Sequence, residues 1–159
     1  MDLYYQESHR PARPMTFGEA TKTCLVKSGD MNGRASRSEF WSFFLFYVPM
    51  MPGLWVIDLF FTMGIYSLSS EIGIGLLDTL LFVPASYLVV LMQLVFLYSF
   101  TSATVRRLHD VGRTGWWLLL TPTLIGLLVI GFFLFLEGES NKNKYGAVPT
   151  NDPIEASMA

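Results

Sequence analysis

The sequence predicts an all-α integral membrane protein, a helical bundle of three transmembrane helices preceded by a short amphipathic helix. The composition is 52% hydrophobic and 15% aromatic, and 15% of the residues are charged, whereas soluble domains carry roughly 25% charged residues. Three long apolar runs with few charges follow one another along the chain, and runs of this length are typical of membrane spans. A soluble bundle of unusually apolar helices would not explain three such runs in succession.

The N-terminal region is polar. We interpret residues 1–15, which contain two prolines, as a flexible tail. A short helix is predicted over residues 16–28, because Thr16 and Glu19 have the spacing of a capping box. Two placements suit this helix, either on the membrane surface or packed against the rest of the protein. Its apolar face comprises Phe17, Ala20, Cys24 and Leu25.

The first span is predicted at about residues 38–67. Ser36 and Glu39 again have capping-box spacing, directly before the apolar run. Two prolines should kink the span without dividing it, because the apolar run before them is too short to cross a bilayer. These prolines are Pro49 and Pro52. No cleaved signal peptide is expected, so this span would serve as its own insertion signal.

The second span is predicted at about residues 72–105 as one long helix, kinked or tilted, with a bend at Pro84. As one helix it would be about 51 Å long. A hairpin of two shorter spans is the alternative, but its halves would lose residues to the turn. The third span is predicted at residues 114–136, with Trp116 and Trp117 where an interfacial aromatic belt belongs.

The predicted membrane domain therefore covers residues 16–136, and residues 137–159 form a polar, irregular tail. Basic residues flank the first span and join the second to the third, whereas the turn around Glu71 has none. Because basic loops stay in the cytoplasm, we expect the N-terminus and the Arg106–Arg113 loop on that side. The Glu71 turn and the C-terminus would then lie outside, although Lys142 and Lys144 mildly oppose this placement of the C-terminus.

Two polar strings flank the spans: GRASRSEFW from Gly33 to Trp41, and RRLHDVGRTGWW from Arg106 to Trp117. Together they resemble the YhaH-like family of small bacterial inner-membrane proteins, a domain of unknown function (number 805). A closing N-x-YG-x-x-P pattern of that family is also present, as Asn143, Tyr145, Gly146 and Pro149. The resemblance covers about residues 16–149, and the extended N-terminal tail departs from it. It implies a multi-span inner-membrane protein and no established activity, so no catalytic residue is carried over.

Five guanidinium groups, which we call the arginine cluster, are expected to gather at one membrane face. They belong to Arg34, Arg37, Arg106, Arg107 and Arg113. Arginine binds phosphate and carboxylate with a planar fork, and each basic residue near an anionic leaflet contributes roughly 1 kcal/mol of attraction. Three roles fit: topology with lipid anchoring, a specific site for an anionic head group or small effector, and internal salt bridges with Glu39 or Asp110. Within one helix, Arg106 and Asp110 are a turn apart and can pair.

His109 and Asp110 raise the question of acid–base chemistry. Adjacent helical residues point about 100° apart, and no motif places a nucleophile beside them. We therefore expect a structural hydrogen bond for His109, and a pH-sensing role is the alternative. Asp58 and Asp78 each lie within an apolar region. They could share a proton for ion coupling, or lie at the outer interface bonded to nearby hydroxyls, which we favour.

The function expected from the sequence is a non-enzymatic membrane module that binds anionic lipid head groups or a membrane partner through the arginine cluster, His109 and Asp110. A small transporter or channel component using Asp58 and Asp78 is the alternative, and a lipid-acting enzyme is the third. No cofactor and no metal site are predicted, because the one cysteine and two histidines are too few for a zinc site. Membrane lipids, a second copy or a larger membrane partner are the expected partners, and nucleic acid is not.

Overall fold

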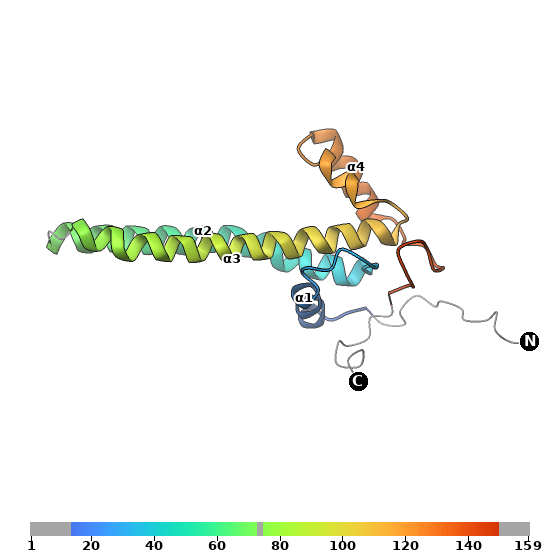
Figure 1. Ribbon diagram of the computed structural model, residues 1–159, viewed down its shortest axis with the longest axis horizontal. Helices are drawn as coiled ribbons and strands as arrows, with labels where there is room; N and C mark the ends of the chain where they lie inside the picture. Colours follow the sequence, from blue (N-terminus) through green and yellow to red (C-terminus); the bar gives the residue numbers. More distant parts are fainter. Residues whose placement is uncertain (1–13, 73–74, 150–159) are drawn as a thin grey trace, which may run out of the picture. The chain divides into compact units, whose positions relative to one another are not determined.

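The computed structural model describes residues 14–72 and 75–149, without the side chains of residue 69 and residues 72–86. Its elements are α1 (Phe17–Val26), α2 (Arg37–Ile72), α3 (Gly75–Asp110), the 3-10 helix η1 (Gly115–Leu120) and α4 (Leu124–Phe135), as Figure 1 shows. The predicted all-α class is confirmed. The chain divides into two compact units. Unit 1 lies within residues 1–44 and 98–159, and unit 2 comprises residues 45–97.

The two long helices agree with the first two predicted spans. Each has 36 residues, which corresponds to about 54 Å and exceeds the hydrocarbon core of roughly 30 Å. Arg37–Leu68 and Tyr87–Asp110 are long and apolar enough to cross a membrane. α2 runs without interruption through its two prolines, and the second region forms one helix rather than a hairpin. The bend at Pro84 stays a prediction.

Unit 2 carries an apolar surface. Within it, the rings of Phe46 on α2 and Phe96 on α3 are 5.9 Å apart. Most of its large apolar side chains point outward. In the most apolar stretch of Arg37–Leu68, 6% of the residues are buried. A core helix of a soluble protein would instead be mostly buried, so this surface suits lipid. The most exposed side chains of the unit include Trp55, Phe60, Phe61, Tyr66 and Tyr87.

The third predicted span is not one continuous helix. Residues 115–120 form η1, and after a turn the chain starts again as α4, which has 12 residues. Pro122, which has no backbone N–H, lies in this turn. The Thr123 hydroxyl accepts a hydrogen bond from Gly126 N at 3.0 Å and caps the new helix. The expectation of a single helix over residues 114–136 is therefore wrong.

η1 and α4 instead form an antiparallel hairpin in unit 1, which Figure 1 shows in orange. Near its open end, the rings of Trp117 and Phe133 are 5.2 Å apart. At its closed end, Gly126 lies against the backbone of Leu120, where an added Cβ would overlap the carbonyl oxygen. Only glycine allows this close approach.

α1 packs against the rest of unit 1, as the second of its two expected placements proposed. Its capping box forms, with Glu19 N bonded to the Thr16 hydroxyl and the Glu19 carboxylate bonded to Thr16 N. Its buried side contributes Ala20 and Cys24 to the core. After the helix, the Ser102 hydroxyl of α3 donates to the Lys27 and Asp30 carbonyls. The core continues with Met15, Ala35, Phe40, Phe43, Ala103 and Leu108.

Candidate functional site

One buried ion pair of unit 1 joins α3 to α2. Arg106 Nη1 donates to Glu39 Oε1 at 2.6 Å, and the two side chains are 2% and 4% exposed. The Ser36 hydroxyl accepts from Glu39 N at 3.1 Å, so Ser36 caps α2. The Glu39 carboxylate, however, turns to Arg106 instead of closing a capping box. Two further nitrogens of Arg106, Nε and Nη2, are buried without a hydrogen-bond partner among the described residues.

Cys24 adds a third group to this pair. Its thiol donates to Glu39 Oε1 at 3.7 Å. Burial, and to a lesser extent the neighbouring Glu39 charge, raises the pKa of the Cys24 thiol to about 12. The thiol is therefore protonated at physiological pH, which makes it a structural donor rather than a nucleophile.

A second buried group centres on Asp110. Arg34 Nε donates to Asp110 Oδ1 at 3.0 Å, and Arg107 Nη1 donates to Oδ2. All three side chains are fully buried. The expected Arg106–Asp110 pair is thus wrong. Neighbouring residues on a helix point about 100° apart, so Arg106 faces α2 while Arg107, three residues before Asp110, reaches that carboxylate.

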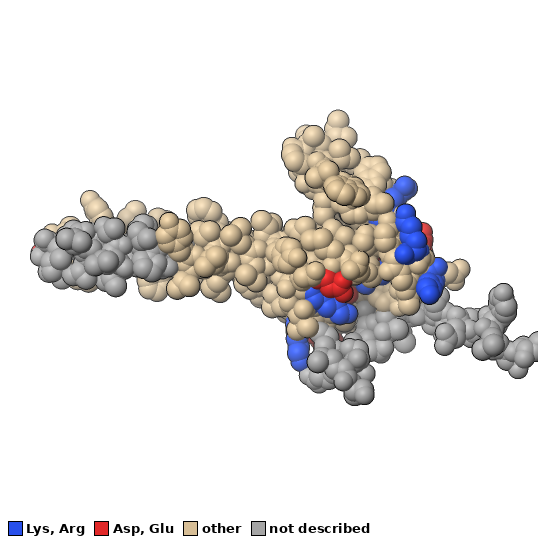
Figure 2. All heavy atoms as spheres, in the orientation of Figure 1, with Lys and Arg blue, Asp and Glu red and all other residues tan. Residues whose placement is uncertain are grey.

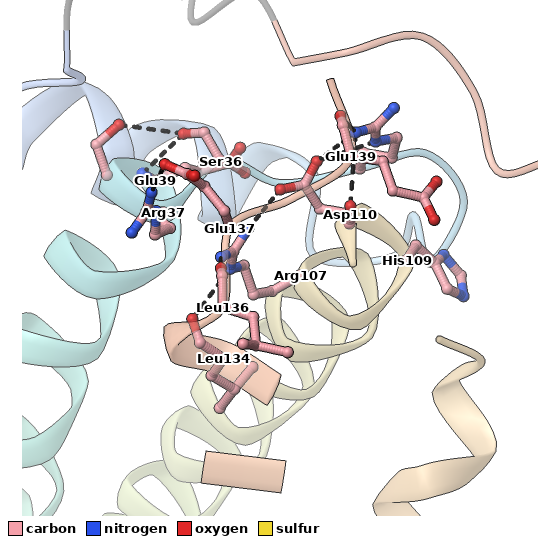
Figure 3. Close-up of polar contacts among 12 residues, drawn as sticks. Ser36, Arg37, Glu39, Arg107, His109, Asp110, Leu134, Leu136, Glu137 and Glu139 are labelled. Atoms are coloured by element: carbon pink, nitrogen blue, oxygen red, sulfur yellow. Dashed lines mark hydrogen bonds and ion pairs between the residues drawn. The ribbon is translucent and has the colours of Figure 1, made fainter. Parts of the chain in front are cut away.

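The same two arginines hold the segment that follows α4. Arg107 Nε donates to the Leu134 carbonyl at 3.2 Å, and Nη2 donates to the Leu136 carbonyl, as Figure 3 shows. The last carbonyls of a helix lack partners within it, and a cation there is favourable. Arg34 in turn donates to the carbonyls of Glu139 and Asn141.

We call this arrangement the C-terminal clasp: Arg34, Arg107 and Asp110 with the backbone of residues 134–141. It is completed by Glu139 N, which donates to the Asp110 carbonyl at 2.8 Å. Gly138 lies so close to the Asp110 carboxylate that an added Cβ would overlap it. Residues 137–149 were expected across the membrane from the Arg106–Arg113 loop. They bond directly to that loop's first residues, and the side of the membrane on which they lie stays a prediction.

His109 makes structural contacts of its own, and Figure 3 shows its ring turned away from Arg107. Its Nδ1 is 3.2 Å from the Gly33 carbonyl, and its ring stacks on Tyr145 at 3.8 Å and 3°. Asn143 Nδ2 donates to the His109 carbonyl at 2.9 Å. Asn143 and Tyr145, which belong to the closing N-x-YG-x-x-P pattern, therefore pack on His109. The structural hydrogen bond expected for His109 is the one to Gly33.

The remaining members of the arginine cluster are exposed. Arg37 pairs with Glu137 at 2.6 Å at the surface, and the Arg113 guanidinium lies 5.0 Å from the centre of the Phe133 ring. Figure 2 shows Lys and Arg spheres on unit 1, whereas the visible surface of α4 is tan. The exposed basic residues of the unit are Lys22, Lys27, Arg37, Arg113, Lys142 and Lys144.

The structure thus brings together most of the residues singled out from sequence, but as internal partners. Asp58 lies in unit 2, half-buried, with its carbonyl accepting from the Thr62 hydroxyl at 2.7 Å. The Asp78 side chain lies outside the described residues, so the pairing of the two aspartates stays a prediction. Sequence reasoning missed the contact of Cys24 with Glu39 and the backbone carbonyls bound by arginine. Within the described residues, no three His, Cys, Asp or Glu side chains gather as metal ligands.

The long apolar helices and the buried ion pairs belong to a helical membrane protein whose two polar strings bind each other inside unit 1. A family model described as "Protein of unknown function (DUF805)" matches residues 29–147. The chain belongs to this family, which confirms the resemblance seen in the sequence. The matched residues include the buried pair of Arg106 with Glu39 and the buried pairs of Asp110 with Arg34 and Arg107.

Named relatives support the same assignment. The chain is 34% identical to inner membrane protein YhaI of Escherichia coli strain K12 over 123 residues, which cover 77% of this chain and 84% of the relative. It is 32% identical to inner membrane protein YhaH of the same strain over 122 residues, 76% and 88% of the two chains. No solved structure matches it. The protein is therefore a bacterial inner-membrane protein.

Proposed function

We propose that this protein is a non-enzymatic inner-membrane module that crosses the bilayer with α2 and α3 and binds anionic lipid head groups with the exposed cations of unit 1. The observation that supports this proposal is the distribution of charge. All nine basic residues of the described chain lie in unit 1, and unit 2 has none. A unit that holds every described cation, attached to long apolar helices, suits the anionic surface of a membrane.

The exposed part of the arginine cluster carries this role, and its buried part does not. Arg34, Arg106 and Arg107 are at most 7% exposed and bind internal acceptors. Offering them to a lipid phosphate would break buried ion pairs, and losing one partner of such a pair costs about 3–5 kcal/mol. Attraction of an exposed cation to an anionic leaflet contributes roughly 1 kcal/mol. The buried arginines therefore shape the unit that presents the exposed ones.

Arg37, Arg113, Lys142 and Lys144 are the residues that we assign to head-group binding. Arg37 is the first residue of α2, and Arg113 follows the last residue of α3 by three positions. The two lysines follow the C-terminal clasp. Glu137, which pairs with Arg37, opposes binding because it neutralises one of these cations. The alternative of an ion-coupled transporter through Asp58 and Asp78 stays a prediction.

The test measures which lipids stay bound. Protein equilibrated in detergent with equal amounts of phosphatidylglycerol and phosphatidylcholine is examined by native mass spectrometry. The parent should retain more phosphatidylglycerol, and glutamine at the four cationic positions should lower this preference at least five-fold, because about 1 kcal/mol corresponds to that factor. As a matched control, Glu137→Gln should raise the preference. Equal retention of both lipids by the parent would refute the proposal, and a lipid-free dimer would favour a second copy as partner.

A further inference from the structure

We propose that η1 and α4 form a re-entrant hairpin, which inserts its apolar tip among the acyl chains of the leaflet next to the arginine cluster and returns to the same side. The described chain then crosses the membrane twice, through α2 and α3. The partner of the hairpin surface is lipid. This inference requires the membrane location that the family shows, and it does not depend on head-group binding.

The two ends of the hairpin are bonded to each other. Asp110, the last residue of α3, precedes the hairpin, and Glu139 follows it. The Glu139 N–H donates to the Asp110 carbonyl at 2.8 Å. Arg107 of α3 binds the carbonyls of Leu134 and Leu136 at the end of α4. The ends of a crossing helix must be separated by the hydrocarbon core of roughly 30 Å. A segment whose ends meet enters and leaves on one side.

The hairpin is also too short for a crossing by either arm. α4 has 12 residues and η1 has six, which correspond to about 18 Å and about 12 Å. The arms lie beside each other, as the contact of Trp117 with Phe133 and the close approach of Gly126 to Leu120 require. Their lengths therefore do not add, and the tip reaches little beyond the middle of a bilayer.

The surface of the hairpin is apolar on nearly every side. No charged residue lies between Arg113 and Glu137. No residue of α4 has a polar side chain, and a helix that is apolar all round belongs in lipid or in a large protein interior. Gly126, Ile130, Phe133 and Leu134 form its buried side, and the broad opposite side is exposed. The most exposed side chains are Leu124 at 75%, Ile125 at 76%, Leu128 at 69%, Phe132 at 61% and Phe135 at 65%.

The threonine hydroxyls of the tip are satisfied within the chain. The Thr121 hydroxyl donates to the Leu118 carbonyl at 2.7 Å, and the Thr123 hydroxyl donates to the Leu120 carbonyl at 2.8 Å while accepting from Gly126 N. In hydrocarbon, each unsatisfied group costs several kcal/mol. The tip is therefore built for a medium without water.

The hairpin decides the side of the C-terminal segment. Residues 137–149 lie on the same side as the start of α2, and the concentration of arginine there places that side in the cytoplasm. Lys142 and Lys144, which oppose an external position, then fit the rule. The Ser70 end of α2 lies on the opposite side, because α2 and α3 each cross once.

Single cysteines report the side of each segment. In full-length protein carrying Cys24→Ser, cysteine is placed at the exposed positions Asn32, Ser70 and Ala147, and a membrane-impermeant maleimide is applied to spheroplasts and to inverted vesicles. Asn32→Cys and Ala147→Cys should label in inverted vesicles, and Ser70→Cys should label in spheroplasts. Labelling of Ala147→Cys together with Ser70→Cys would overturn the proposal, because it would require a third crossing.

Cysteines at the tip of the hairpin test whether lipid covers its surface. Leu124→Cys, or Leu128→Cys if the first variant does not insert, should resist the impermeant maleimide from both sides. A bimane attached there should be quenched by lipids brominated in their acyl chains. Labelling from the Ser70 side would show that the hairpin crosses, and high-yield disulfide cross-linking between copies would assign the surface to a second copy. Either result overturns the proposal.

Discussion

Asp110→Asn tests whether the C-terminal clasp holds residues 134–141 against α3. The substitution keeps the shape of the side chain and removes its charge, so Arg34 and Arg107 remain fully buried without a counter-ion. Removing one partner of a buried ion pair costs about 3–5 kcal/mol. Both arginines keep their bonds to backbone carbonyls, which places the expected cost at the lower end, about 3 kcal/mol.

Opening of the clasp can be measured by proteolysis. Trypsin cleaves after Lys142 and Lys144, which lie directly beyond the clasp. If cleavage requires release of this segment, about 3 kcal/mol raises the rate roughly 150-fold in detergent-solubilised protein. Glu137→Gln is the matched control, because it removes an exposed ion pair with Arg37 that contributes about 0–1 kcal/mol. Equal cleavage of the parent and Asp110→Asn would refute the reasoning.

Three further predictions concern the neighbouring contacts. Glu39→Gln leaves Arg106 buried without its carboxylate. The loosened core should let N-ethylmaleimide label Cys24, whereas the parent protein should resist labelling. Equal labelling of the two proteins would contradict this prediction. Gly138→Ala should increase trypsin cleavage at least ten-fold by displacing the clasp carboxylate, whereas Gly131→Ala, with open space around it, should not. The raised pKa of Cys24 stabilises the fold below about pH 9 and loses this contribution as pH rises towards 12. Stability measured by detergent denaturation should therefore fall over that window in the parent and less in Cys24→Ala.

The buried ion pairs have a consequence for function. An arginine that binds a buried carboxylate and several carbonyls is not available to a ligand, so residue type alone does not mark a binding site. Within the string RRLHD, Arg107 and Asp110 belong to the C-terminal clasp, Arg106 pairs with Glu39 of α2, and His109 stacks on Tyr145. Such pairs contribute little net stability compared with apolar packing, and they specify which segments meet. This suits a protein whose apolar surfaces would pack on one another with little preference.

The sequence by itself determined the features that depend on local pattern. Apolar runs predicted α2 and α3, since helix formation and burial in lipid respond to the composition of consecutive residues. Thr16 and Ser36 were placed correctly at helix starts because capping depends on neighbours three residues away. The polar strings identified the family. The same logic failed for residues 114–136, where hydropathy predicted an apolar segment without indicating where its two ends lie.

Only the tertiary structure decided which groups meet. Helical spacing offered Asp110 to Arg106, but the partner of Arg106 is Glu39, 67 residues away, and Arg34 reaches Asp110 over 76 residues. A helix period says which residues share a face and not what lies opposite that face. The clasp is built largely on backbone carbonyls, and every residue has one, so no residue type announces it. The return of the hairpin to its starting point follows from those long-range bonds.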